Sequence, residues 1–62
     1  MLKTIQTANF LIKMSQERQY DLARQLNSDL ISKRIYNREY HYEVAYQQGL
    51  NELISYLTRE EI

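Results

Sequence analysis

The feature that most constrains this chain is its lack of helix-breaking residues. Its 62 residues contain no proline and a single glycine, Gly49. Proline and glycine are the residues that most reliably interrupt a helix. The sequence also has no internal repeat and no low-complexity segment. It therefore predicts an all-α fold in one small domain, residues 1–62, with helix over nearly the whole chain.

The first helix is predicted at about residues 4–26. Along it, positions separated alternately by three and four residues form one face that is apolar at both ends and polar at its centre. The face comprises Ile5, Ala8, Ile12, Ser15, Gln19, Leu22 and Leu26. This spacing is typical of a helix that packs along one side.

A turn is expected at residues 27–28, because Asn27, Ser28 and Asp29 have short side chains that bond the local backbone and favour turns and helix caps. A second helix should then begin near Asp29 and end near residue 58. Its predicted inner face also has helical spacing. That face comprises Ile31, Ile35, Tyr42, Tyr46, Leu50, Leu53 and Leu57.

Gly49 leaves one alternative open. Glycine often follows the end of a helix and asparagine often precedes the start of one, so Gly49 and Asn51 could separate a short third helix. The apolar face nevertheless continues through Gly49 without a change of phase, which favours one continuous helix.

The two helices should form an antiparallel hairpin. A turn centred on residue 28 pairs positions whose numbers add up to roughly 56. This register places Ala8 near Gly49, Ile12 near Val44, Ser15 near Tyr42 and Lys13 near Glu43. The predicted core combines the inner faces of both helices. Its residues are Ile5, Ala8, Ile12, Leu22, Leu26, Ile35, Tyr42, Tyr46, Leu53 and Leu57.

A chain of this length has difficulty in folding alone. A domain of 60 residues buries only about 60% of the surface that its unfolded chain exposes. The sequence has no cysteine, so neither a disulfide nor a thiolate zinc site can stabilise it. We therefore expect the hairpin to form a homodimer, most simply a four-helix bundle.

Four of the six tyrosines lie between residues 34 and 50. Tyr42 and Tyr46 belong to the predicted core, whereas Tyr36, Tyr40 and Val44 form a second strip on another side of the helix. Phe10 and Met14 form a comparable second strip on the first helix. Two helices cannot cover both strips, so each is a candidate for a dimer interface or for binding another protein. The predicted partner surface is Tyr36, Tyr40 and Val44, with Arg34, Arg38 and His41 around it.

Catalysis is not expected, and neither a cofactor nor a metal ion is predicted. Positions three or four residues from His41, the only histidine, hold no usual metal ligand. Glu39 and Glu43 are spaced to share a helix face, but such a pair is usually just solvated. With one histidine and no cysteine, the sequence shows no pair of a catalytic nucleophile and a general base. The chain is therefore predicted to be a non-enzymatic adaptor or inhibitor.

DNA binding is the alternative. The formal net charge is zero, but residues 1–38 carry +4 and residues 39–62 carry −4. Residues 18–38 resemble a helix-turn-helix in their order of Leu22, Ala23 and Leu26, a turn, and then a basic helix. The resemblance implies that Lys33, Arg34 and Arg38 contact nucleic acid. Ser28 and Lys33 depart from the motif, which has apolar residues at those positions.

In size and expected topology the chain is similar to small plasmid and phage regulators whose helical hairpins dimerise into four-helix bundles. The longest apolar run near the N-terminus, Phe10-Leu11-Ile12, is too short for a secretory signal. No segment of the sequence is long and apolar enough for a membrane span. A cytoplasmic protein without membrane contact is expected.

Overall fold

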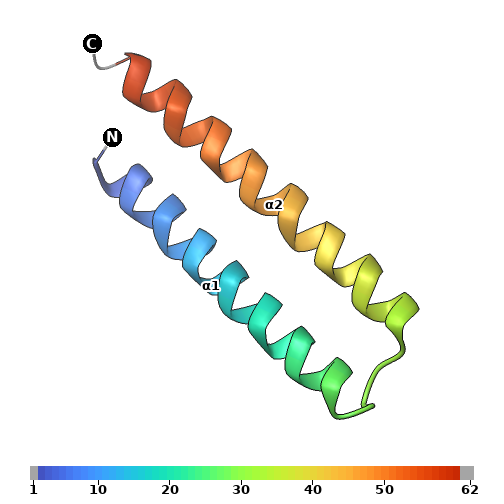
Figure 1. Ribbon diagram of the computed structural model, residues 1–62. Coiled ribbons are helices and arrows are strands. Elements are labelled where there is room, and N and C mark those ends of the chain that lie inside the picture. The colour runs from blue at the N-terminus through green and yellow to red at the C-terminus, as the bar shows by residue number, and fades with distance from the viewer. Residues whose placement is uncertain (1, 61–62) are drawn as a thin grey trace.

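A computed structural model describes residues 2–60 of the chain and consists of two helices, α1 (Leu2–Asn27) and α2 (Lys33–Glu60). The helices run antiparallel and side by side along their whole length (Figure 1). No strand is present in this range. The predicted all-α hairpin is confirmed.

The turn between the helices begins later than the sequence predicted. The backbone N–H of Leu30 donates to the carbonyl of Gln25 at 2.9 Å, and that of Asp29 donates to the carbonyl of Leu26 at 3.1 Å. These two bonds and the positive φ of Asp29 (58°) are the features of a Schellman motif, which ends a helix with one left-handed residue. The prediction that Asp29 starts the second helix is wrong, because Asp29 closes the first.

Ser32 is the residue that starts α2. Its hydroxyl oxygen accepts a hydrogen bond from the backbone N–H of Ile35 at 3.2 Å, which satisfies one of the free N–H groups of the first turn. The connection therefore covers residues 28–32 and is centred on residue 30. The predicted turn at 27–28 was centred two residues too early.

Gly49 does not interrupt α2, which is helical from Lys33 to Glu60. The prediction of one continuous helix is confirmed, and no third helix follows Gly49 within the described residues. Gly49 has an ordinary helical conformation, since it has no positive φ.

The hairpin has almost no core. Three of the residues with described side chains are buried, and only Ala8 is apolar among them; Ser15 and Glu43 are the others. The Cα positions span 48 × 16 × 9 Å, so the molecule is a slab one helix thick. Each helix therefore exposes both of its sides to solvent, apart from the narrow strip that contacts the other helix.

The later turn changes the register between the helices. The hydroxyl of Ser15 contacts Glu43 and Gln47 rather than Tyr42. Glu43 forms its ion pair with Arg18 rather than with Lys13. No atom lies within 4 Å of the position that a Cβ on Gly49 would occupy, so Ala8 does not pack closely against it. These predicted pairs were wrong because each assumed a turn centred on residue 28.

The predicted inner face of α2 is also partly wrong. Tyr42 is 62% exposed, and Ile35 and Leu53 are about 40% exposed. Glu43 and Gln47 face α1 instead, because Ser15, Arg18 and Gln19 supply hydrogen-bonding partners for them. The prediction ranked the faces of α2 by hydrophobicity and did not consider that a polar pair could be buried.

Candidate interaction surfaces

The centre of the hairpin is held by a polar cluster that comprises Ser15, Arg18, Gln19, Glu43 and Gln47. The Ser15 hydroxyl donates to Oε1 of Glu43 at 2.6 Å and accepts a hydrogen bond from Nε2 of Gln47 at 3.0 Å. Gln47 also donates to Oε1 of Gln19 at 2.8 Å. No buried side-chain nitrogen or oxygen within the described residues lacks a partner. The cluster is therefore fully satisfied.

Arg18 completes the cluster on one side. Its Nε donates to Oε2 of Glu43 at 2.9 Å and its Nη2 donates to Oε1 at 3.0 Å, a bidentate arrangement. The hydrogen bond from Arg18 lowers the pKa of Glu43, against the opposing effect of burial, and the hydrogen bond from Ser15 lowers it further. The same bond to Glu43 raises the pKa of Arg18. The guanidinium of Arg18 also lies over the ring of Tyr46, 5.6 Å from its centroid.

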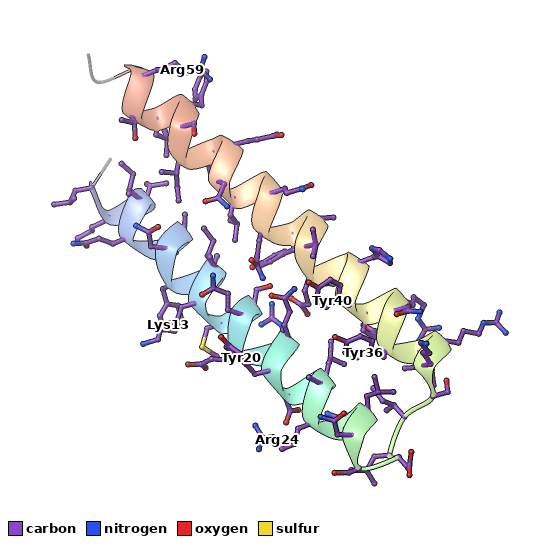
Figure 2. The ribbon with its side chains drawn as sticks, in the orientation of Figure 1. Lys13, Tyr20, Arg24, Tyr36, Tyr40 and Arg59 are labelled. Carbon is purple, nitrogen blue, oxygen red and sulfur yellow. The ribbon has the colours of Figure 1, made fainter. Side chains whose placement is uncertain are left out.

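One broad side of the slab carries a groove that we call the tyrosine groove. It runs between the two helices from the middle of the slab towards the turn. Its lining residues are Gln16, Gln19, Tyr20, Ala23, Tyr36, Tyr40 and Gln47. The rings of Tyr36 and Tyr40 stack with their centroids 5.7 Å apart, and both lie between the helices in Figure 2. Tyr36 is half-buried, whereas Tyr40 is more exposed.

The structure brings together only part of the predicted partner surface. Tyr36, Tyr40 and His41 are in a chain of ring contacts, since His41 meets Tyr40 edge-on at 6.2 Å. Val44 follows Tyr40 by one helical turn and is half-buried. Arg34 and Arg38 are both exposed. Each is two residues from Tyr36, about 200° around the helix, and therefore lies on the outer side of α2. Arg38 there pairs with Glu39 at 3.2 Å.

The opposite broad side carries more exposed apolar surface, and we call it the apolar face. One groove joins Leu11 to Leu50 and Leu53, and another joins Arg18 to Ile35. Tyr46, below Arg18, stacks on Tyr42 at 6.4 Å. Phe10 and Met14 belong to the same side. Met14 lies one helical turn before Arg18, and Phe10 lies one turn before Met14. The apolar face thus comprises Phe10, Leu11, Met14, Ile35, Tyr42, Tyr46, Leu50 and Leu53.

Sequence reasoning identified Phe10 and Met14 as an uncovered strip but assigned Tyr42 and Leu53 to the core. It therefore did not recognise that both helices contribute exposed apolar side chains to the same side. The available signal was the polar centre of the α1 face, Ser15 and Gln19, which required polar partners on α2 and so turned Tyr42 outwards.

The helix-turn-helix resemblance is not matched by the arrangement of the helices. That motif sets its two helices at roughly 90–120° to each other, whereas α1 and α2 lie side by side (Figure 1). Lys33, Arg34 and Arg38 are all exposed. They lie within the first two turns of α2, where Arg38 pairs with Glu39 at 3.2 Å.

Neither a metal centre nor a membrane span was found in the part of the chain that the structure describes. No three side chains of His, Cys, Asp or Glu there are grouped so as to hold a metal ion. Neither helix has a stretch apolar and long enough to cross a bilayer. Comparisons with protein-family models, with curated proteins and with solved structures gave no match.

Proposed function

We propose that this chain is a non-enzymatic adaptor or inhibitor that forms a homodimer and binds another protein through a tyrosine-rich helical surface. The observation that carries the proposal is the exposure of large apolar side chains on a slab with almost no core. Among the described residues, ten large hydrophobic side chains are exposed, while a single apolar residue is buried. Contiguous exposed apolar surface of this kind marks sites of association.

The partner-binding surface in this proposal is the tyrosine groove together with Val44 and His41. Tyrosine suits such a site because it contributes a large contact area and loses little conformational entropy on binding. Tyr36 and Tyr40 stack on each other and line the groove together with residues of α1. Gln16 is exposed beside the rings and supplies hydrogen-bonding groups for a partner. Arg34 and Arg38 could contribute charge from the outer side of α2.

Affinity capture with matched variants tests this proposal. The wild-type protein, a Tyr36→Ala/Tyr40→Ala variant and a Tyr56→Ala control are immobilised and exposed to extract from the native host. Tyr56 is also exposed on α2 but does not line the tyrosine groove. We expect one set of proteins to bind the wild type and the control and to be absent from the double variant. Equal capture by all three proteins, with the double variant folded by circular dichroism, would refute the groove as the binding site.

DNA binding is the second candidate, and the exposed basic cluster at the start of α2 supports it. Lys33, Arg34 and Arg38 could contact phosphates without a helix-turn-helix. Such binding releases counterions, so the affinity for duplex DNA should fall steeply as the salt concentration rises. Titration of a fluorescent duplex at low and at moderate salt tests this candidate, and no binding at low salt removes it.

A further inference from the structure

We infer that the apolar face is where a second copy of this chain docks, with Phe10 of each copy inserted over Gly49 of the other. The inference rests on the proposed homodimer and names its interface. It leaves the tyrosine groove, on the opposite side of the slab, free for another protein.

The apolar face is the better of the two sides for self-association. Five of the ten exposed large hydrophobic residues lie on it: Phe10, Met14, Ile35, Tyr42 and Leu53. The tyrosine groove side has Tyr20 and Tyr40, together with the polar side chains of Gln16, Gln19 and Gln47. Burial of apolar area is the main favourable term in association, so the side with more exposed apolar side chains gains more from a second copy.

The area of the face is sufficient for a stable dimer. The broad side of the slab measures 48 × 16 Å between Cα positions. A second slab laid along it would cover on the order of 800 Å² per copy, which is the area per partner of a standard protein interface. The resulting four-helix arrangement would give each helix a second neighbour and would enclose the side chains that the single hairpin leaves exposed.

Gly49 provides a feature on the apolar face that a second copy of this chain can match. Glycine within a helix costs about 1 kcal/mol relative to alanine, and nothing in the hairpin requires it. Gly49 has no positive φ, and no atom lies within 4 Å of where its Cβ would be. It follows Tyr46 by three residues and precedes Leu53 by four, so it forms a notch on the apolar face. The notch is open in the single chain.

Phe10 is the side chain that matches this notch. It is 60% exposed. It lies on α1 at about the same height along the slab as Gly49 on α2, as the neighbouring contacts of Leu11 with Leu50 and Leu53 show. A two-fold axis parallel to the helices would lay α1 of each copy against α2 of the other at equal heights. It would therefore place Phe10 over the notch twice, as a self-complementary interface requires.

The charged groups on this side of the slab already have partners. Asp21 and Glu39 line the groove that joins Arg18 to Ile35, and they pair with Arg24 and Arg38. Arg18 is about half exposed but already has both of its hydrogen bonds to Glu43. Covering Arg18 therefore keeps this charge paired, and a buried charge without its partner is the strongly destabilising case. In the same two-fold arrangement Tyr42 of the second copy lies level with Arg18 and could cover its guanidinium.

Cross-linking between single-cysteine variants tests the inference directly, because the chain contains no native cysteine. Protein carrying Phe10→Cys is mixed with protein carrying Gly49→Cys and oxidised under mild conditions. We expect a disulfide-linked heterodimer in high yield, because a disulfide requires the two Cα atoms to lie within about 7 Å. The control mixture pairs Tyr20→Cys with Tyr40→Cys, both on the opposite side of the slab.

A second variant keeps the test independent of cross-linking chemistry. Gly49→Leu places a side chain in the notch, and in the single chain no other side chain lies within 4 Å of the Cβ position. We expect it to weaken the dimer at least tenfold by sedimentation, although leucine favours a helix more than glycine does. Efficient cross-linking of the Tyr20→Cys and Tyr40→Cys control mixture, or a dimer that is unaffected by Gly49→Leu, would overturn the assigned face alone. A wild-type protein that is monomeric would instead refute the homodimer on which the inference rests.

Discussion

Replacing Glu43 with alanine should destabilise the protein more than any other single removal of a charge. The Glu43 carboxylate accepts one hydrogen bond from the fully buried Ser15 hydroxyl and two from Arg18. A hydrogen bond to a charged group contributes about 1.5–3 kcal/mol. The Arg18 contribution is smaller, up to about 1 kcal/mol, because water reaches its half-exposed guanidinium. We therefore expect a loss of about 2–4 kcal/mol.

The loss can be measured by urea denaturation followed by circular dichroism, at one fixed protein concentration because the protein is proposed to be a dimer. Glu39→Ala is the matched control, since it makes the same chemical change one turn earlier on α2. Glu39 pairs only with Arg38 at the surface, so its replacement should change the free energy of unfolding by no more than about 0.5 kcal/mol. Equal unfolding midpoints for the two variants would refute the argument that the polar cluster holds the hairpin in register.

The other predictions concern the same pair of helices. The pKa of Glu43 is lowered below its ordinary value of 4.5, so the ionised carboxylate stabilises the folded state above pH 4.5. This stabilisation should be lost as the pH falls through the lowered pKa. Denaturation at several pH values should show the loss, and Glu43→Gln should make the stability depend less on pH. Ser32→Ala should lower the free energy of unfolding by about 1 kcal/mol, because it removes the hydrogen bond that caps α2. Ser28→Ala removes no such bond and should change the free energy of unfolding little. Equal effects of the two substitutions would contradict the cap assignment. Asp29→Gly should raise the melting temperature, because the left-handed conformation costs a non-glycine residue about 1–2 kcal/mol; a lower melting temperature would count against the turn geometry.

The sequence was sufficient to predict the two helices because their signals are local. The absence of proline and the regular apolar spacing gave the start and end of α1 within two residues of Leu2 and Asn27. The start of α2 was placed four residues too early, since Asn27, Ser28, Asp29 and Ser32 can all cap or end a helix. Which of them does so depends on the Schellman hydrogen bonds of Asp29 and Leu30, and these form only in the folded chain.

The candidate surfaces were harder to predict, because they depend on which side of each helix faces the other. An amphipathic pattern identifies an apolar strip but not what covers it. Here the contact between helices is built around the hydrogen bonds of Ser15 with Glu43 and Gln47. That choice rotates α2 and exposes Tyr42 and Leu53, which hydrophobicity alone assigns to the core. Tyr36 and Tyr40 were placed on a separate strip, and they do lie on the other side of the slab from Tyr42.

Sedimentation equilibrium over a dilution series from millimolar to nanomolar tests the central claim most directly. The claim is that a slab in which Ala8 is the one buried apolar residue among those with described side chains needs a second copy to be stable. At high concentration we predict a species of twice the 7.5 kDa chain mass. As dilution dissociates the dimer, the helix content and the melting temperature should fall together. A chain that stays monomeric at every concentration and still melts sharply from a fully helical state would contradict the account.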